Sequence, residues 1–133
     1  GFHLGPKLSD EHRDDVEFGF RIAKEISRLE IGQSVVVKRG AVVAVEGFEG
    51  TDKCLLRGGE LSGKEGGGVA VKVAKEKHDM RWDIPCIGEQ TLETCVTARL
   101  SVLAIEAGKT LLLDRERVEA IATRNRVSVV SVN

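Results

Sequence analysis

The stretch Ser34-Val-Val-Val-Lys-Arg-Gly-Ala-Val-Val-Ala-Val-Glu46 sets the first elements of the fold. Its two runs, 34–38 and 41–46, are rich in valine, and β-branched side chains favour extended backbone. Arg39-Gly40 separates the runs, and glycine accepts the positive φ that a tight turn requires. The stretch therefore predicts a β-hairpin, and its mostly apolar strands predict a largely buried sheet.

Segments with apolar residues at helical spacing lie on both sides of the hairpin in the sequence. Upstream, residues 16–29 carry two adjacent apolar stripes, which predict one wide buried helix face. The stripes are Phe18, Ile22, Ile26 and Leu29, and Val16, Phe20 and Ala23. We expect residues 1–14, with Ser9, to cap this helix and Ile31-Gly32 to end it. Downstream, a short loop at 47–50 leads into residues 51–61, whose apolar spacing predicts a second helix.

The remaining chain alternates between predicted strands and helices. Apolar runs predict strands at 69–73, 101–105, 110–113 and 127–132, and helices are expected to begin at Thr91 and Asp114. We expect the glycines within 58–68 to form a flexible connection, and the charged residues 75–90 to form a surface loop. The expected fold class is α/β: a single domain over residues 1–133, with a mixed β-sheet packed by about four helices.

The composition excludes several classes of function. The 133 residues carry 20 Lys+Arg against 21 Asp+Glu, and they include only 4 Phe and 1 Trp. No basic surface is expected, so nucleic acid is not an expected partner. No apolar run approaches the roughly 20 residues that cross a bilayer. Three irregularly spaced cysteines predict buried thiols in a reducing compartment, and we expect a cytoplasmic protein.

The segment Glu46-Gly-Phe-Glu-Gly-Thr-Asp52 lies where a predicted strand ends and a helix begins. Backbone N–H groups at a helix start bind anions, so Gly50 and Thr51 are candidate substrate-binding residues for a phosphate. Glu46, Glu49 and Asp52 are candidate ligands of a hard cation such as Mg²⁺ or Mn²⁺. The alternative is that Thr51 or Asp52 only caps the helix and that the glutamates are solvated.

A second group of charged residues lies between Lys72 and Asp83. In extended chain, Asp79, Arg81 and Asp83 share one face. The two acids are candidate catalytic residues that bind metal or activate water, and Lys72 and Arg81 are candidate substrate-binding residues that neutralise phosphate oxygens. The alternative is a solvated loop with local ion pairs, each worth under ~1 kcal/mol.

Five blocks of this sequence together resemble the C-terminal domain of LpxI-type UDP-2,3-diacylglucosamine pyrophosphatases. The blocks are Leu29-Glu-Ile-Gly-Gln-Ser-Val-Val-Val37, Ala44-Val-Glu-Gly-Phe-Glu-Gly-Thr-Asp52, Val71-Lys-Val73, Asp79-Met-Arg-Trp-Asp-Ile-Pro85 and Glu106-Ala-Gly108. The resemblance extends from about residue 4 to residue 132. The chain departs from the family pattern at His78, where the family usually has glutamine, and at Cys86, where it usually has threonine.

The resemblance implies an enzyme. The family hydrolyses UDP-2,3-diacylglucosamine to UMP and 2,3-diacylglucosamine 1-phosphate in lipid A synthesis, with a divalent metal, typically magnesium. The family's essential aspartate corresponds to Asp79, with Asp83 as the second acid. Family members carry an N-terminal domain that is absent from this chain, and the lipid substrate is expected to lie between the two domains. Whether the isolated domain is active without that domain is left open by the sequence.

The expected partners follow from the same resemblance. They are a UDP-linked diacylated glucosamine and, through that lipid, peripheral contact with the inner membrane. The apolar strands 41–45 and 127–132 are each expected to leave an edge through which a homodimer could form. Two other functions remain open at this point: a non-catalytic domain that binds a nucleotide sugar or phosphate, and an interaction domain whose charged loop is solvated.

Overall fold

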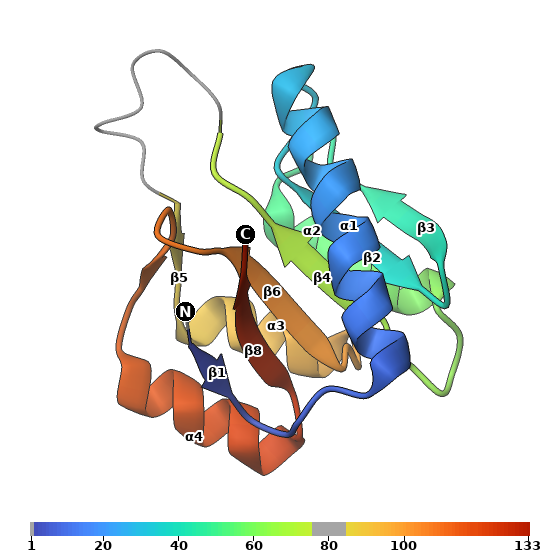
Figure 1. Cartoon of the computed structure of the whole chain (residues 1–133). Helices are drawn as coiled ribbons and strands as arrows, with labels where there is room; N and C mark the ends of the chain where they lie inside the picture. The colour runs from blue at the N-terminus through green and yellow to red at the C-terminus, as the bar shows by residue number, and fades with distance from the viewer. Residues whose placement is uncertain (1, 76–84) are drawn as a thin grey trace.

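The computed structural model describes residues 2–75 and 85–133. Asp79, Arg81 and Asp83 lie outside these ranges. The elements in chain order are β1 (His3–Leu4), α1 (Asp10–Arg28), β2 (Ser34–Lys38), β3 (Ala41–Val45), α2 (Thr51–Leu61), β4 (Val69–Lys72), β5 (Cys86–Ile87), α3 (Glu89–Thr97), β6 (Val102–Glu106), β7 (Leu111–Leu112), α4 (Arg115–Asn125) and β8 (Ser128–Val132). Within the described ranges, the expected single α/β domain with a mixed sheet and four helices is confirmed (Figure 1).

The main sheet has six strands in the order β1-β8-β6-β4-β2-β3. Strands β4, β6 and β8 are parallel to one another, whereas β2 is antiparallel to both β4 and β3. Strand β3 therefore runs in the same direction as β4. As a result β3, β4, β6 and β8 all finish at one end of the sheet, next to Glu46, Lys72, Glu106 and Val132. We call this end the carboxyl edge.

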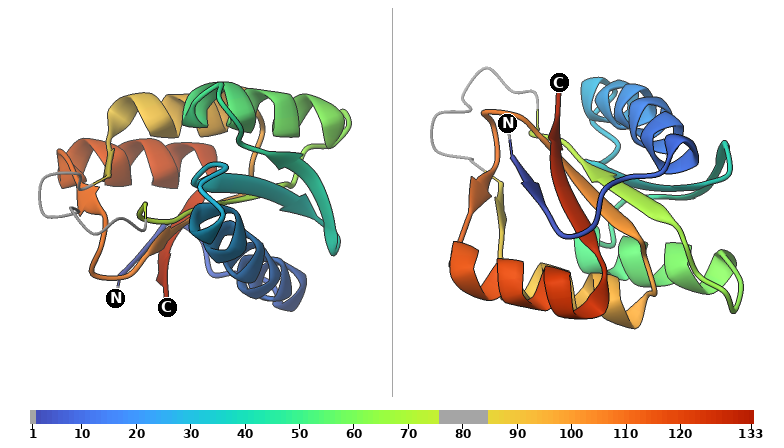
Figure 2. Two further views of the ribbon diagram at one scale, coloured as in Figure 1. Left: turned by 90° about the horizontal axis from the view of Figure 1, so that it is seen from above. Right: turned by 60° about the horizontal axis from the view of Figure 1, so that its bottom comes forward.

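The helices cover the two faces of the sheet unequally. The connections β3-α2-β4, β4-α3-β6 and β6-α4-β8 all advance across the sheet in one direction. Since such crossovers share one hand, their helices are expected on the same face. Figure 2 shows α2, α3 and α4 together on one face and α1 alone on the other. The N-termini of α2, α3 and α4 consequently all point toward the carboxyl edge.

Alternating side chains of the strands form two apolar clusters, one on each face of the sheet. Val36 and Leu103 face α2, α3 and α4, and their cluster includes Leu55 and Leu92. Their neighbours Val35 and Val71 face α1 instead, where Val16, Ala23 and Ile26 pack. The central strands are therefore buried on both faces, as the continuous valine runs predicted.

The predicted hairpin is confirmed, although β3 ends at Val45, one residue before the predicted end of its run. Arg39 and Gly40 have φ of 50° and 77°, which is the backbone of a type I′ turn. Their N–H groups donate hydrogen bonds to the carboxylate of Asp15 at 3.0 and 2.9 Å. Asp15 is only 3% exposed, so α1 holds the turn through a buried charged side chain.

Helix α1 begins earlier than the apolar pattern at 16–29 that predicted it. Ser9 caps it as expected, because the Ser9 hydroxyl accepts a hydrogen bond from the N–H of His12 at 3.1 Å, but α1 already begins at Asp10. The prediction that Leu29 belongs to the buried face was wrong. Leu29 is the C-cap residue after the helix and is 52% exposed. Gly19 instead belongs to the buried face, where an added Cβ would lie 2.7 Å from Cγ2 of Val71 in the sheet.

Two further predictions were wrong, one about the glycines at 58 and 59 and one about an edge of the sheet. Gly58 and Gly59 belong to α2 rather than to a flexible connection, because only glycine fits where this helix contacts Val36 and Ala98. Strand β8 is not an edge of the sheet, since β1 pairs with it through His3–Val130 and Leu4–Val129. Strand β3 does form an edge, as expected.

Other boundaries differ in ways that matter less to the site. Helix α3 begins at Glu89 after the N-cap Gly88, two residues before the expected Thr91. Residues 111–112 pair with Cys86–Ile87 in a separate small sheet instead of joining the main one. Cys54 and Cys95 are buried as predicted, but Cys86 is exposed because it lies on this short outer strand.

Candidate functional site

The carboxyl edge brings Glu46, from the first predicted group of polar residues, to the same end of the sheet as Lys72, the candidate residue of the second group that the structure describes. Glu46 directly follows β3, and Lys72 ends β4. Strand β2 lies between them with Ser34 at its beginning, and Ser34 pairs with Lys72 in the register of the sheet. By strand alternation, all three side chains are on the face covered by α2 and α3. In open α/β sheets, ligands bind outside the carboxyl ends of the strands, so this is the candidate site.

Glu46 is a buried carboxylate with an ordered position. It is 8% exposed, and its Oε1 accepts a hydrogen bond from the Ser34 hydroxyl at 2.6 Å. The same oxygen accepts the backbone N–H of Gln33 at 3.3 Å and lies 3.5 Å from the Thr51 hydroxyl. Its Oε2 accepts no hydrogen bond from the residues that the structure describes. Glu46 therefore has one oxygen that holds its position and one that can bind a ligand.

Glu49 is engaged differently. Its Oε1 accepts the backbone N–H of Gly47 at 3.0 Å, and its Oε2 accepts Nε of Arg57 at 3.0 Å. These hydrogen bonds, first that from Gly47 and then that from Arg57, lower the pKa of Glu49 below its ordinary value. Arg57 also donates to the carbonyl oxygen of Val45 at 2.9 Å, which ties α2 to the end of β3. Glu49 thus fixes the loop that carries the site.

The N-terminus of α2 opens toward the site without a side-chain cap. Its N-cap residue is Gly50, with φ of 92°, a conformation that favours glycine. Neither Thr51 nor Asp52 caps the helix with its side chain, so the capping alternative for these two residues was wrong. The first N–H groups of the helix remain available to an anion, and the helix dipole favours negative charge there.

Asp52 connects this helix to the next one. Its Oδ2 accepts a hydrogen bond from Nε2 of Gln90 at 3.3 Å, and Gln90 lies in the first turn of α3. The N-termini of α2 and α3 therefore meet at the carboxyl edge. Lys72 is partly buried nearby, and its ammonium forms no ion pair with the described residues. Two helix N-termini and a lysine make this end of the sheet attractive to an anion.

The three candidate metal ligands do not form one cluster. Among residues 2–75 and 85–133, no group of three or more His, Cys, Asp or Glu side chains is placed to hold a metal ion. Both oxygens of Glu49 already have partners, whereas Glu46 and Asp52 each keep one carboxylate oxygen without a hydrogen bond from the described residues. Hard cations take carboxylate oxygens, so Glu46 and Asp52 fit a metal and Glu49 fits less well.

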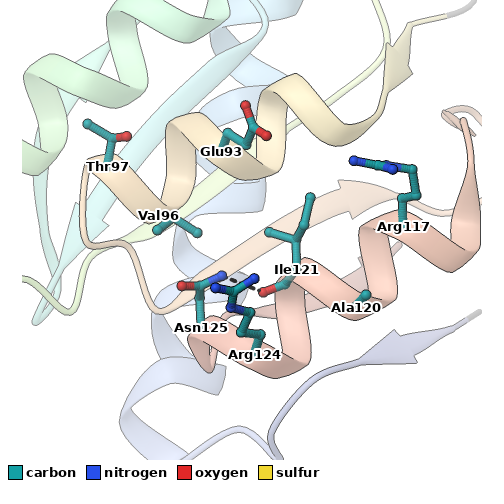
Figure 3. Close-up of a pocket in the computed structure, with 8 residues that line it drawn as sticks. All are labelled: Glu93, Val96, Thr97, Arg117, Ala120, Ile121, Arg124 and Asn125. Carbon is teal, nitrogen blue, oxygen red and sulfur yellow. Dashed lines mark hydrogen bonds between the residues drawn. The ribbon is translucent and has the colours of Figure 1, made fainter.

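The groove in Figure 3 lies elsewhere. It has a volume of about 620 Å³ and is lined by α3 and α4, with Val96, Ala120 and Ile121 as its apolar residues. Arg117 at its rim forms an ion pair with Glu89 at 2.7 Å. This ion pair lowers the pKa of the Glu89 carboxyl. None of the groove's lining residues is a predicted site residue.

Comparison of this chain with known proteins shows the family to which it belongs. A family model described as the LpxI C-terminal domain matches residues 1–130. The chain is also 39% identical, over 129 residues, to the UDP-2,3-diacylglucosamine pyrophosphatase LpxI of Caulobacter vibrioides. The chain belongs to the LpxI family. The match covers 92% of this chain and 46% of that relative, so the chain spans about half the length of the curated protein.

The LpxI family blocks noted in the sequence cluster in the fold. The blocks ending at Asp52, Val73 and Gly108 all include the end of a strand at the carboxyl edge. The block containing Asp79, Arg81 and Asp83 lies outside the described residues, so the roles assigned to these three stay predictions. In the described part of the chain, no helix has the length and apolar character needed to cross a membrane.

Three polar residues at this edge were missed by the sequence analysis: Ser34, Gln90 and Glu106. Ser34 and Gln90 had no signal of their own, since each matters only through a carboxylate that is distant in sequence. Glu106 did have one. It opens a family block and follows four apolar strand residues, so a charged side chain at that position is unusual for a buried strand.

Proposed function

We propose that the full-length protein hydrolyses the diphosphate of UDP-2,3-diacylglucosamine in lipid A synthesis, releasing UMP and 2,3-diacylglucosamine 1-phosphate. The observation that carries this proposal is the coincidence of an LpxI family match with an anion-attracting carboxyl edge. The relative bears the name of this activity, and the present chain has the chemistry that a diphosphate requires. The proposal concerns the whole protein, of which this chain is the C-terminal part.

The roles of the described residues follow from their positions. The N–H groups at the start of α2, at Gly50 and Thr51, bind phosphate oxygens. Lys72 neutralises further negative charge on the diphosphate from the end of β4. Glu46 is kept in place by Ser34 and Gln33, and its second oxygen accepts no hydrogen bond from the described residues. Preorganised groups of this kind stabilise the charge that develops during attack at phosphorus.

The proposal includes a divalent cation, Mg²⁺ or Mn²⁺, held by Glu46 and Asp52. Such a cation supplies charge neutralisation and a Lewis acid for phosphoryl oxygens. Glu49 joins this ligand set only if it releases Arg57. In the proposal Asp79 and Asp83 orient the attacking water or complete the metal site, and Arg81 neutralises charge. These three assignments rest on the family resemblance.

The cellular setting is part of the same proposal. Since the substrate is a lipid, we place the enzyme in the cytoplasm with peripheral contact to the inner membrane. A homodimer that forms through the exposed strand β3 also stays a prediction, which the oligomeric state in solution would test.

The decisive experiment measures release of UMP by the full-length protein and by its Asp79→Ala variant. We expect the variant to lose about 10²- to 10⁴-fold in kcat while its circular dichroism and Tm are unchanged. Glu119→Ala, an exposed acid on α4, is the control and should retain activity. A chelator should stop hydrolysis, and Mg²⁺ should restore it.

Two outcomes would contradict the proposal. Near-normal turnover by the Asp79→Ala variant would show that Asp79 is not a catalytic residue. Binding of a UDP-sugar by the wild-type protein without any turnover would instead favour the non-catalytic binding domain.

A further inference from the structure

Arg57 lies in the middle of α2 and belongs to neither of the predicted groups of polar residues. Its guanidinium has partners on two other elements. Nε and Nη2 lie 3.0 and 2.9 Å from Oε2 of Glu49, and Nη2 also donates a hydrogen bond to the carbonyl oxygen of Val45 at 2.9 Å. One side chain of the helix therefore holds both the last residue of β3 and the loop at residues 46–50.

The two residues that Arg57 holds are next to the two parts of the candidate site. Val45 directly precedes Glu46, whose buried carboxylate is the proposed cation ligand. Glu49 directly precedes Gly50, where the N–H groups proposed to bind phosphate begin. Glu46 and Gly50 are thus each one residue away from a residue that the same guanidinium contacts.

The backbone of this loop needs support from a side chain. The loop contains Gly47 and Gly50, and glycine restricts the backbone least of all residues. Helix α2 also has no side-chain cap that would fix its entry. Oε1 of Glu49 accepts the N–H of Gly47 at 3.0 Å, so the Glu49 carboxylate joins the beginning of the loop to Arg57 on the helix. Loss of Arg57 would release this carboxylate from the helix.

We propose that Arg57 is a positioning residue, which fixes the Glu46 carboxylate relative to the phosphate-binding N–H groups at the start of α2. This role rests on the proposed function, in which that carboxylate and those N–H groups serve one diphosphate. Arg57 acts through Val45 and Glu49 and does not touch the substrate. Misplacement of reacting groups by about 1 Å can cost about 10²-fold in rate, so loss of the guanidinium should lower kcat more than it raises KM.

Two variants separate the shape of the guanidinium from its charge. Arg57→Lys keeps the positive charge, but a single ammonium replaces the planar donors that reach Val45 and Glu49 together. Arg57→Gln removes the charge as well. In the full-length protein, we expect both variants to lower kcat for UMP release by about 10- to 100-fold, with KM within about threefold of wild type. Wild-type kcat in Arg57→Lys, or losses confined to KM, would overturn the inference.

Arg13 provides a matched control. Its Nη2 also donates to a carboxylate, that of Asp10 at 3.3 Å, and to a backbone carbonyl, that of Leu8 at 3.4 Å, but it lies at the start of α1. The Arg57 side chain is 42% exposed, and ion pairs this exposed add little stability, so Tm should change little in all these variants. Arg13→Gln should keep the wild-type kcat. An equal loss of kcat in Arg13→Gln would overturn the inference.

A double variant tests whether Arg57 acts through Glu49. Glu49→Ala removes the same contact from the other side and should also lower kcat. Because the two residues share one contact, the variant that combines Arg57→Gln with Glu49→Ala should lose less than the product of the two single losses. Losses that multiply would show that Arg57 acts independently of Glu49, and would overturn the inference.

Hydrogen exchange at the Gly47 amide tests the contact without any turnover. We expect faster exchange in both Arg57 variants than in wild type or in Arg13→Gln, because Glu49 is no longer held by the helix. Equal exchange in all of them would overturn the inference. If wild type releases no UMP while the exchange result is as expected, the proposed function fails and the contact stands. If wild type is active and both Arg57 variants are as fast, only the positioning role fails.

Discussion

The three cysteines differ in burial, and burial sets the reactivity of each thiol. Burial raises the pKa of Cys54 to about 11 and that of Cys95 to about 12. Cys86 is exposed. Because the thiolate is the reactive form, we expect iodoacetamide at pH 8 to modify Cys86 while Cys54 and Cys95 stay unmodified. Peptide mapping by mass spectrometry measures this, and the denatured protein, in which all three should react, is the control.

The same raised pKa values give a dependence of stability on pH. The ordinary thiol pKa is 9.0, so the unfolded chain loses these protons at lower pH than the folded protein does. Below about pH 9 both states hold the proton and the stabilisation is complete, and it is lost as the pH rises toward about 11 and 12. We expect the free energy of unfolding to fall over this window. A flat profile in wild type would contradict the prediction.

The individual residues of the site could be predicted only in part. Glu46 and Asp52 were identifiable because they flank a strand-to-helix junction, which is a local feature of the sequence. Glu106 was not identified, since its partners are Lys24, 82 residues away, and Ala74, 32 residues away. A single sequence records the charge of such a residue and not its partners.

At the scale of elements, α2 shows how glycine can serve packing instead of flexibility. A Cβ on Gly59 would lie 2.4 Å from the carbonyl oxygen of Ala98, and one on Gly58 would lie 2.5 Å from the side chain of Val36. The helix can approach both α3 and the sheet closely because these positions have no side chain. The sequence pattern favoured a flexible connection for these two glycines, because glycine in a sequence can indicate either flexibility or close packing.

Substitution of Gly59 tests this close contact. Alanine gains about 1 kcal/mol in helix propensity, but its methyl group would overlap a backbone oxygen that cannot turn aside. We expect Gly59→Ala to lower the free energy of unfolding by about 1–2 kcal/mol, measured by urea denaturation. Glu60→Ala, at an exposed position of the same helix, is the control and should be neutral or slightly stabilising. A stabilised Gly59→Ala variant would show that the helix can shift.

The longer elements were predictable, and of the two-residue strands only β7 was, within the strand expected at 110–113. The hairpin has two runs of five residues and a glycine turn, so its local pattern was sufficient. Strands β1 and β5 have two residues each, too few for any periodicity. They exist because distant segments pair with them, as β8 does with β1. That pairing also explains why β8 is not an edge.

At the scale of the whole molecule, one sheet carries two apolar clusters. Val35 and Val36 are adjacent in β2 and both fully buried, yet they belong to clusters on opposite faces. Each cluster uses the same four central strands β2, β4, β6 and β8. Loss of packing on one face therefore disturbs the strands that the other face needs, and we expect the domain to unfold in a single cooperative transition.

Two neighbouring substitutions test this cooperativity. Val35→Ala removes packing against α1, and Val36→Ala removes packing against α2; each should lower the free energy of unfolding by about 2–3 kcal/mol. If the clusters are coupled through the sheet, both variants shift the same transition, and circular dichroism and hydrogen exchange on either face report the same midpoint. Should each variant instead shift only the exchange of its own face, the two faces would be separate folding units, and the carboxyl edge could not be held rigidly from both sides.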